Sequence, residues 1–233
     1  MDDPRQIDTD YQGFYAARTS LRVYPTEFVV RIMLAQYPGL TFEKPLPGAK
    51  VLDVAFGDGR NTAFLAERGL AVSGIEIAQG IVEQTGTRMR KLGHAVDLRV
   101  GRNSAIPYPD GTFDGIVACS CCYYCDEGDS IADNLAEYGR VLKPGGFLIA
   151  SVADRESFIF RGAEPQPDGS FLVRNDPYGV RNGYRLHAFA TADDLTASFS
   201  AVFEGFSIGR SRSDYFGIEE RLFWVVCRRK SDA

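Results

Sequence analysis

Hydrophobic and polar positions alternate with two different periods along residues 49–152, and this alternation predicts a parallel sheet. Short apolar runs typical of buried strands occur at 49–55, 70–76, 95–100, 112–120 and 147–152. Segments with apolar residues three and four positions apart lie between them, at 61–68, 79–92 and 131–142, and a glycine or Lys-Pro-Gly-Gly follows each. Strands joined by helices favour parallel pairing, because a crossover helix returns the chain to the same edge of the sheet.

The flanking segments complete the predicted arrangement. A helix near 26–37 stops at Pro38-Gly39, and about the first 40 residues are expected to form a helical cap. Residues 154–186 are rich in Pro, Gly, Asp and Arg and too long for an ordinary connection, which indicates a substrate-side insertion or lid. Thr191 is expected to cap a helix over 193–200, and two strands are predicted near 201–209 and 221–228.

Composition favours one large domain. The chain of 233 residues is 45% hydrophobic and 12% aromatic, which suffices for one substantial core. We predict a single α/β domain over residues 1–233: a Rossmann-like, seven-stranded, mostly parallel sheet with helices on both faces and an antiparallel last strand.

The net charge predicts the kind of binding partner, and the apolar and N-terminal segments predict the cellular compartment. A net charge of -5 argues against a surface that neutralises phosphates, so we expect a small-molecule partner and no nucleic acid. No apolar run is long enough for a membrane span, and the polar start MDDPRQIDTD is not typical of a signal peptide. We therefore expect a cytoplasmic protein whose five cysteines are reduced; the oligomeric state stays open.

The segment VLDVAFGDGRNT, residues 51–62, carries the best chemical signal. A strand delivers Asp53, and Gly57 and Gly59 then allow a sharp turn and close approach of a ligand. Glu76 ends the next strand, where a carboxylate can accept hydrogen bonds from both hydroxyls of a ribose. The pattern suits a dinucleotide or an adenosyl cofactor, and Thr62 in place of a third small residue disfavours the dinucleotide.

Four segments in order resemble the motifs of class I S-adenosylmethionine-dependent methyltransferases. They are VLDVAFGDGRNT, GIEI (74–77), IPYPDGTFDGIVAC (106–119) and EYGRVLKPGGFLIAS (137–151), and GRN (59–61) resembles the branch that acts on small molecules. The resemblance implies S-adenosyl-L-methionine as cofactor and S-adenosyl-L-homocysteine as product. It also implies that Asp53 organises the loop of Ala55, Gly57 and Gly59 near the amino-acid end of the cofactor, that Glu76 holds the ribose, and that Ile77 packs on the adenine.

Two positions depart from that family pattern. Ala55 replaces the usual first glycine, and Arg102 occupies the place where the family often has an acidic residue near the adenine amino group. Asn103 or Ser104 is therefore expected to supply that polar contact.

The cysteine-rich segment CSCCYYC, residues 119–125, follows the fourth predicted strand, at the sheet edge where open α/β folds bind ligands. Zinc is disfavoured because Cys122 and Cys125 form a single C-x-x-C arm, so no metal site is predicted. Buried packing and capture of a soft substrate are the alternatives. We expect Cys119 to flank the cofactor, one of Tyr123 and Tyr124 to orient the nucleophile, and the other to enter the core.

Candidates for the acceptor side come from two other segments. Tyr11, Tyr15 and Arg18 in YQGFYAAR (11–18) are expected to close over the site and contact substrate. His187 is a candidate general base, which is needed only if the acceptor arrives protonated; a packing histidine is the alternative.

These features together predict a methyltransferase with a small-molecule acceptor, whose acceptor atom (O, N or S/metalloid) stays open. An RNA or protein methyltransferase is one alternative, although no added recognition domain or basic face is visible. A non-catalytic subunit that binds an S-adenosyl ligand is the other, and only turnover separates it from the enzyme.

Overall fold

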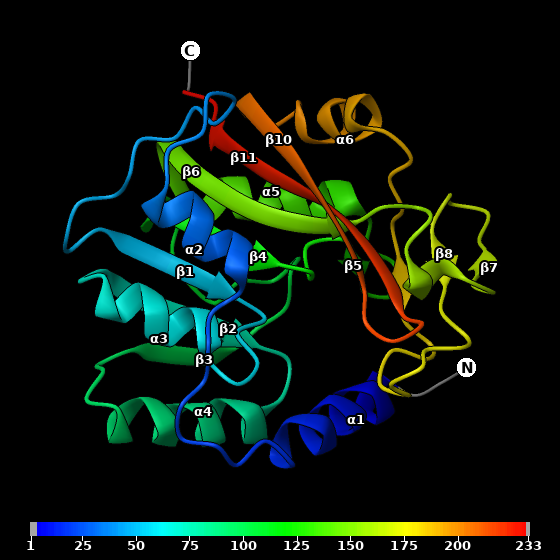
Figure 1. Ribbon diagram of the computed structural model, residues 1–233, viewed down its shortest axis with the longest axis horizontal. Coiled ribbons are helices and arrows are strands. Elements are labelled where there is room, and N and C mark those ends of the chain that lie inside the picture. Colours follow the sequence, from blue (N-terminus) through cyan, green and yellow to red (C-terminus); the bar gives the residue numbers. More distant parts are fainter. Residues whose placement is uncertain (1–3, 232–233) are drawn as a thin grey trace.

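The computed structural model describes residues 4–231, and a seven-stranded sheet forms its centre (Figure 1). In spatial order the strands are β10 (Phe203–Asp214), β11 (Glu219–Arg229), β6 (Leu142–Ala153), β4 (Phe113–Cys119), β1 (Lys50–Val54), β2 (Ala71–Glu76) and β3 (Asp97–Val100). The five strands from β6 to β3 pair in parallel, whereas β11 is antiparallel to both of its neighbours. The predicted Rossmann-like sheet with an antiparallel last strand is confirmed.

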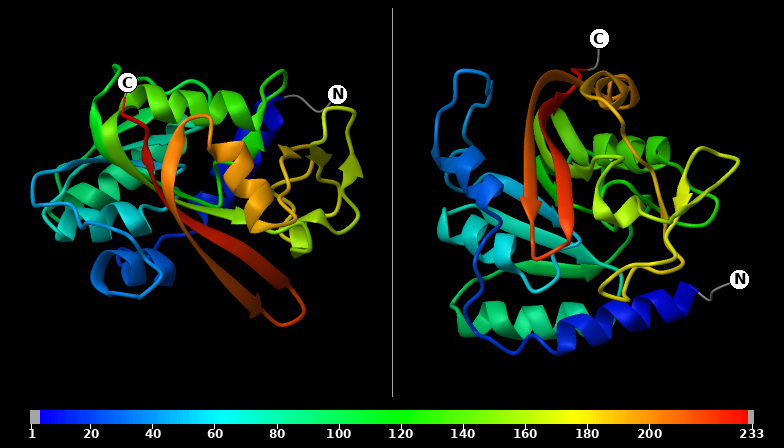
Figure 2. Two further views of the ribbon diagram at one scale, coloured as in Figure 1. Left: turned by 90° about the horizontal axis from the view of Figure 1, so that it is seen from above. Right: turned by 45° about the vertical axis from the view of Figure 1, so that its right-hand side comes forward.

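Six α-helices accompany the sheet in the described part of the chain. They are α1 (Pro4–Ala16), α2 (Glu27–Leu34), α3 (Arg60–Glu67), α4 (Gln79–Lys91), α5 (Ile131–Val141) and α6 (Ala192–Phe199). Helices α3 and α4 pack on β2 and β3, α5 and α6 pack on β6 and β10, and α2 and α5 lie on opposite sides of the sheet (Figure 2). Thr191 is the N-cap of α6 as predicted, since its hydroxyl accepts a hydrogen bond from the Asp194 amide.

The core lies along the central strands because both faces of the sheet are covered there. Leu52 on β1, Ile116 on β4, Leu148 on β6 and Val225 on β11 are fully buried. Continuous apolar runs are the pattern expected of such strands, which explains why the sequence located them well.

A second, four-stranded sheet connects the segment after β4 with the predicted insertion. Its strands, in spatial order, are β5 (Tyr124–Cys125), β9 (Arg185–Leu186), β8 (Phe171–Leu172) and β7 (Glu164–Pro165), and a short 3-10 helix, η1 (Phe158–Phe160), precedes them in the insertion. Strands of two residues have no readable periodicity, so this sheet was not predicted.

Three boundaries differ by three or more residues from those predicted. Strand β10 continues to Asp214, because an edge strand with polar residues such as Arg210 and Arg212 lacks an apolar signal. Strand β6 begins at Leu142 and includes the Lys-Pro-Gly-Gly segment expected to form a turn. The helix predicted over 26–37 ends at Leu34.

The N-terminal helix α1 lies against α4 and below the insertion (Figures 1 and 2). At Gly80 on α4 an added Cβ would lie 2.5 Å from Cδ of Gln12, so the glycine permits this close contact. Residues 1–3 of the predicted helical cap lie outside the described residues. Among the helices of residues 4–231, none is long and apolar enough to cross a membrane.

Candidate active site

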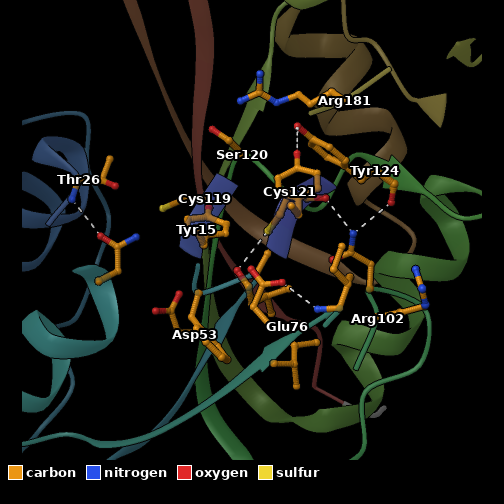
Figure 3. Close-up of a pocket in the computed structure, with 18 of the residues that line it drawn as sticks. Tyr15, Thr26, Asp53, Glu76, Arg102, Cys119, Ser120, Cys121, Tyr124 and Arg181 are labelled. Atoms are coloured by element: carbon orange, nitrogen blue, oxygen red, sulfur yellow. Dashed lines mark hydrogen bonds between the residues drawn. The ribbon is translucent and has the colours of Figure 1, made fainter. Parts of the chain in front are cut away.

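A cavity of about 350 Å³ lies at the carboxyl ends of β1, β2 and β4. This volume falls within the range of small-molecule pockets, and the position is the one at which open α/β sheets bind ligands. We call the part formed by Asp53, Ala55, Glu76 and Ile77 the cofactor wall. Figure 3 shows Tyr124 and Arg181 across the cavity from Asp53 and Glu76. We call these two residues, together with the lining residues Tyr11, Glu220 and Trp224, the acceptor wall.

The loop between β1 and α3 depends on two glycines with positive φ. An added Cβ at Gly59, where φ is 79°, would lie 2.7 Å from Cγ2 of Thr85 and 2.9 Å from Cε of Met89. At Gly57 the same atom would lie 2.4 Å from the Tyr15 hydroxyl oxygen. The glycines therefore let α4 and the ring of Tyr15 approach the loop closely, although neither glycine lines the cavity itself.

Two residues of the cavity wall other than glycine also adopt left-handed backbone conformations. Ala55, directly after β1, has φ of 54°, and Ser120, directly after β4, has φ of 53°. Such conformations cost about 1–2 kcal/mol for L-residues. Ala55 thus keeps a glycine-like conformation at the position where methyltransferases of the family that the sequence resembles usually have a glycine. Backbone strain therefore occurs at the carboxyl ends of β1 and β4, beside the cavity.

The cofactor wall contains two buried carboxyl groups without a cationic partner. Asp53 accepts a hydrogen bond from the Thr62 hydroxyl at 2.6 Å, and Glu76 accepts hydrogen bonds from the amides of Gly57 at 3.0 Å and Ile77 at 2.8 Å. Burial raises the pKa of each carboxyl group to about 7, although these hydrogen bonds lower it in part. Within residues 4–231 no ion pair reaches either group.

These carboxyl groups fit S-adenosylmethionine. Its ammonium and sulfonium charges and its two ribose hydroxyls would compensate the desolvated oxygens of Asp53 and Glu76. Ile77 lines the same wall and offers an apolar surface for a base.

At the expected adenine end, Asn103 is engaged within the protein. Its side-chain amide donates to the carbonyl oxygens of Cys121 at 2.9 Å and Tyr124 at 3.1 Å, and its oxygen accepts from the Tyr138 hydroxyl at 2.7 Å. Asn103 lines the cavity, but its side chain serves to fasten the segment after β4.

The neighbours of Asn103 are engaged as well. Ser104 lies outside the cavity lining and donates to Asp129. Arg102 lines the cavity and forms ion pairs with Asp8 at 2.9 Å and Asp126 at 3.0 Å, which connects α1 to the segment after β5. The polar adenine contact expected from Asn103 or Ser104 stays a prediction, since both side chains are already hydrogen-bonded within the protein and only Asn103 lines the cavity.

The cysteine-rich segment divides between the cavity and the core. Cys119, Ser120, Cys121 and Tyr124 line the cavity, whereas the Tyr123 side chain is buried outside it. Burial raises the pKa values of the Cys119 and Cys121 thiols, so both stay protonated and are weak nucleophiles and poor metal ligands. No group of three or more His, Cys, Asp or Glu side chains in residues 4–231 is arranged to hold a metal ion.

His187 and Arg18 also lie outside the main cavity. The His187 ring packs on Phe189 with 4.7 Å between ring centroids, its amide donates to the carbonyl oxygen of Tyr123, and burial lowers the pKa of its imidazole. Arg18 pairs with Asp58 at 3.1 Å and borders a separate, more open pocket.

The structure thus brings together nine of the residues singled out from the sequence: Tyr11, Tyr15, Asp53, Ala55, Glu76, Ile77, Asn103, Cys119 and Tyr124. Six others are outside the lining: Arg18, Gly57, Gly59, Ser104, Tyr123 and His187. Side chains pack on Gly57 and Gly59 and separate them from the cavity. Arg18 and Ser104 are held elsewhere by hydrogen bonds, Tyr123 is buried in the core, and His187 packs on Phe189.

The acceptor wall contains residues that no sequence signal indicated. Arg181 comes from the insertion, and Glu220 and Trp224 come from β11. Burial raises the pKa of Glu220, and the charges of Arg181 and Arg60 oppose that shift. An isolated Arg in a loop or Glu in a strand has no pattern that marks it, so only the tertiary structure reveals these residues.

The chain is similar to known methyltransferases in part of its sequence and in its fold. Residues 51–146 match the family model described as a methyltransferase domain. A SAM-dependent methyltransferase from Methanosarcina mazei has the same fold, with a TM-score of 0.67 and 18% identity over 90% of this chain and 100% of that one. The chain therefore has the fold of a SAM-dependent methyltransferase, and its residues 51–146 match a methyltransferase domain.

Two named relatives are similar to parts of the chain. Demethylmenaquinone methyltransferase of Tropheryma whipplei (strain Twist) is 34% identical over 102 residues, which are 44% of this chain and 41% of that protein. The chain therefore spans less than half the length of this relative. The ubiquinone biosynthesis O-methyltransferase of Maricaulis maris is 22% identical over 204 residues, 82% of this chain and 79% of that protein.

Proposed function

We propose that this protein transfers a methyl group from S-adenosylmethionine to a small-molecule acceptor. The observation that carries the proposal is the pair of buried carboxyl groups, Asp53 and Glu76, which line a cavity at the sheet edge and form no ion pair among residues 4–231. A cationic cofactor with a ribose supplies what both groups lack.

Each wall of the cavity has a distinct role in this proposal. Glu76 accepts hydrogen bonds from the ribose hydroxyls of the cofactor, Asp53 acts near the amino-acid end of the cofactor, and Ile77 packs on its adenine. The cofactor supplies an electrophilic methyl group that is transferred by in-line displacement. Tyr11 and Tyr15 of α1 close the cavity, exclude water and align the acceptor with that methyl group, and such alignment contributes about 7–11 kcal/mol in well-oriented reactions.

The size and charge of the site favour a small acceptor. The cavity of about 350 Å³ is bounded by α1 and the insertion, and the chain carries a net charge of -5, which disfavours a nucleic-acid substrate. The names of the Tropheryma and Maricaulis relatives refer to demethylmenaquinone and to ubiquinone biosynthesis, which supports a small-molecule acceptor here.

The test is transfer of labelled methyl groups from S-adenosylmethionine into size-fractionated host extract. We expect label in the small-molecule fraction with the wild-type protein, and none above background with Asp53→Ala. Glu83→Ala, on the exposed surface of α4, is the matched control and should retain full transfer. Label confined to RNA or protein would contradict the proposal, and binding of S-adenosylhomocysteine without any transfer would favour a non-catalytic binding subunit.

A further inference from the structure

Arg181 is held at the cavity by a buried aspartate within its own loop. The side chain of Asp176 is fully buried and accepts hydrogen bonds from the amides of Val180 at 3.1 Å and Arg181 at 3.0 Å. Its other oxygen accepts from Nη1 of Arg181 at 3.0 Å. The loop therefore fixes the guanidinium before any ligand binds.

The guanidinium retains unused donors at the cavity. It carries five N–H groups, and the hydrogen bonds recorded among residues 4–231 use one of them, to Asp176. The side chain is 22% exposed, so most of its donors are shielded from bulk water. Figure 3 shows Arg181 across the cavity from Asp53 and Glu76, above Ser120 and Tyr124, on the side where the acceptor must bind.

The groups around Arg181 favour its cationic form. Burial acts to lower the pKa of Arg181, but Tyr124, Tyr11 and Asp176 together raise it above its ordinary value. Tyr11 itself is a neutral phenol whose pKa is raised by burial, and its hydroxyl lies 3.5 Å from that of Tyr124. The Tyr11 hydroxyl therefore offers a hydrogen bond but no negative charge.

Two carboxyl groups act on Arg181, one from its own loop and one from β11. Asp176 is saturated by its loop, as described above. Glu220 on β11 lines the same cavity, but no ion pair within 4.0 Å joins it to Arg181. The cavity thus holds a fixed, largely buried guanidinium that pairs with Asp176 through one N–H group, and its remaining donors have no recorded protein partner among residues 4–231.

We propose that Arg181 binds an oxyanion of the acceptor, so that this enzyme acts on small acidic molecules bearing a phenolate, an enolate or a carboxylate. The inference rests on the proposed function, since it names the acceptor class of that same site. A planar guanidinium suits such oxygens because its N–H groups can form two parallel hydrogen bonds. Tyr11 and Tyr124 add neutral donors beside it.

The chemistry balances without a general base if the oxyanion is itself the nucleophile. An oxygen lone pair of the phenolate or enolate forms the new C–O bond while the S–C bond breaks, and the electrons of that bond return to sulfur as a neutral thioether. No proton has to be removed, which agrees with the position of His187 outside the cavity. A carboxylate bound by Arg181 would instead anchor an acceptor whose nucleophilic atom lies elsewhere.

The test measures binding to the full chain saturated with S-adenosylhomocysteine. The probes are 4-nitrophenol with its neutral analogue 4-nitroanisole, and benzoate with its neutral analogue benzamide. We expect at least one anion to bind about tenfold or more tightly than its analogue, and bound 4-nitrophenol to be more ionised than free 4-nitrophenol by absorbance. Preference for nitrophenolate identifies a phenolate or enolate acceptor, whereas preference for benzoate identifies a carboxylate anchor.

Variants assign the preference to Arg181. Arg181→Gln should remove it while the affinity for the neutral analogues is unchanged, and Arg181→Lys should retain part of it. Arg161→Gln, a more exposed arginine of the same insertion, is the matched control and should bind as the wild type does. If the wild type binds neither anion better than its analogue, or if Arg181→Gln keeps the preference, the inference is overturned. Failure of S-adenosylhomocysteine to bind would contradict the proposed function instead.

Discussion

The two walls of the cavity differ in how the chain builds them. The cofactor wall comes from residues 53–77, that is, from two neighbouring strands and the turns that follow them. The acceptor wall draws on α1, the segment after β4, the insertion and β11, so its residues extend from Tyr11 to Trp224. Under the proposed function, the cofactor thus binds to one compact local unit, whereas the acceptor contacts residues from several segments that are far apart in the sequence.

The largest expected effect is on the cofactor wall. Glu76→Ala removes the acceptor of two backbone amides and the proposed acceptor of the ribose hydroxyls. Hydrogen bonds to a charged group are each worth about 1.5–3 kcal/mol, so affinity for S-adenosylhomocysteine should fall about tenfold to a hundredfold by calorimetry. Glu83→Ala should bind S-adenosylhomocysteine as the wild type does. An unchanged affinity of Glu76→Ala would show that Glu76 does not bind the ribose.

A second prediction uses the acid groups of the same wall. Because the pKa values of Asp53 and Glu76 are raised to about 7 in the folded protein, it binds more protons than the unfolded chain between about pH 4 and pH 7. The free energy of unfolding therefore decreases as pH rises through this window, by up to about 1.4 kcal/mol per pH unit for each group. Urea denaturation at several pH values measures the slope.

Two comparisons sharpen this pH prediction. Asp53→Asn keeps the shape of the side chain but cannot ionise, so the slope should become shallower. Saturating S-adenosylhomocysteine should also reduce it, because hydrogen bonds to ionised Glu76 lower the pKa of that group. A slope that is the same in the wild type and in Asp53→Asn would show that Asp53 does not titrate in this range.

A third prediction concerns the strained turn after β1. Ala55→Gly should raise the free energy of unfolding by up to about 1 kcal/mol, because glycine adopts a φ of 54° without the steric cost that alanine bears. Ala136→Gly, on the exposed face of α5, should lower it by about 1 kcal/mol. Equal destabilisation by both substitutions in urea titrations would contradict the strain at Ala55.

The smallest effect is expected at His187, near the acceptor wall but outside its lining. His187→Gln removes a ring that packs on Phe189 and no group that faces the cavity, so methyl transfer into the small-molecule fraction should stay within about twofold of wild type. A loss of more than about tenfold, with S-adenosylhomocysteine affinity unchanged, would show that His187 takes part in the reaction.

The same division explains what could be predicted from the sequence. The main strands and helices were predictable because buried parallel strands and amphipathic helices have strong periods, and Asp53 and Glu76 because they end such strands. The short second sheet had no period to read. Arg181 and Glu220 line one cavity although they are distant in sequence, so no local pattern indicated them. His187 was selected because histidine is a common general base, but its ring packs on Phe189 and does not line the cavity.

The most direct test of the two-wall account is a crystal structure of the protein with S-adenosylhomocysteine. The account predicts that the ribose hydroxyls donate to the Glu76 carboxylate and that the sulfur atom faces Tyr11, Tyr124 and Arg181. An adenosyl group bound away from Glu76, or a sulfur atom turned away from the acceptor wall, would contradict it.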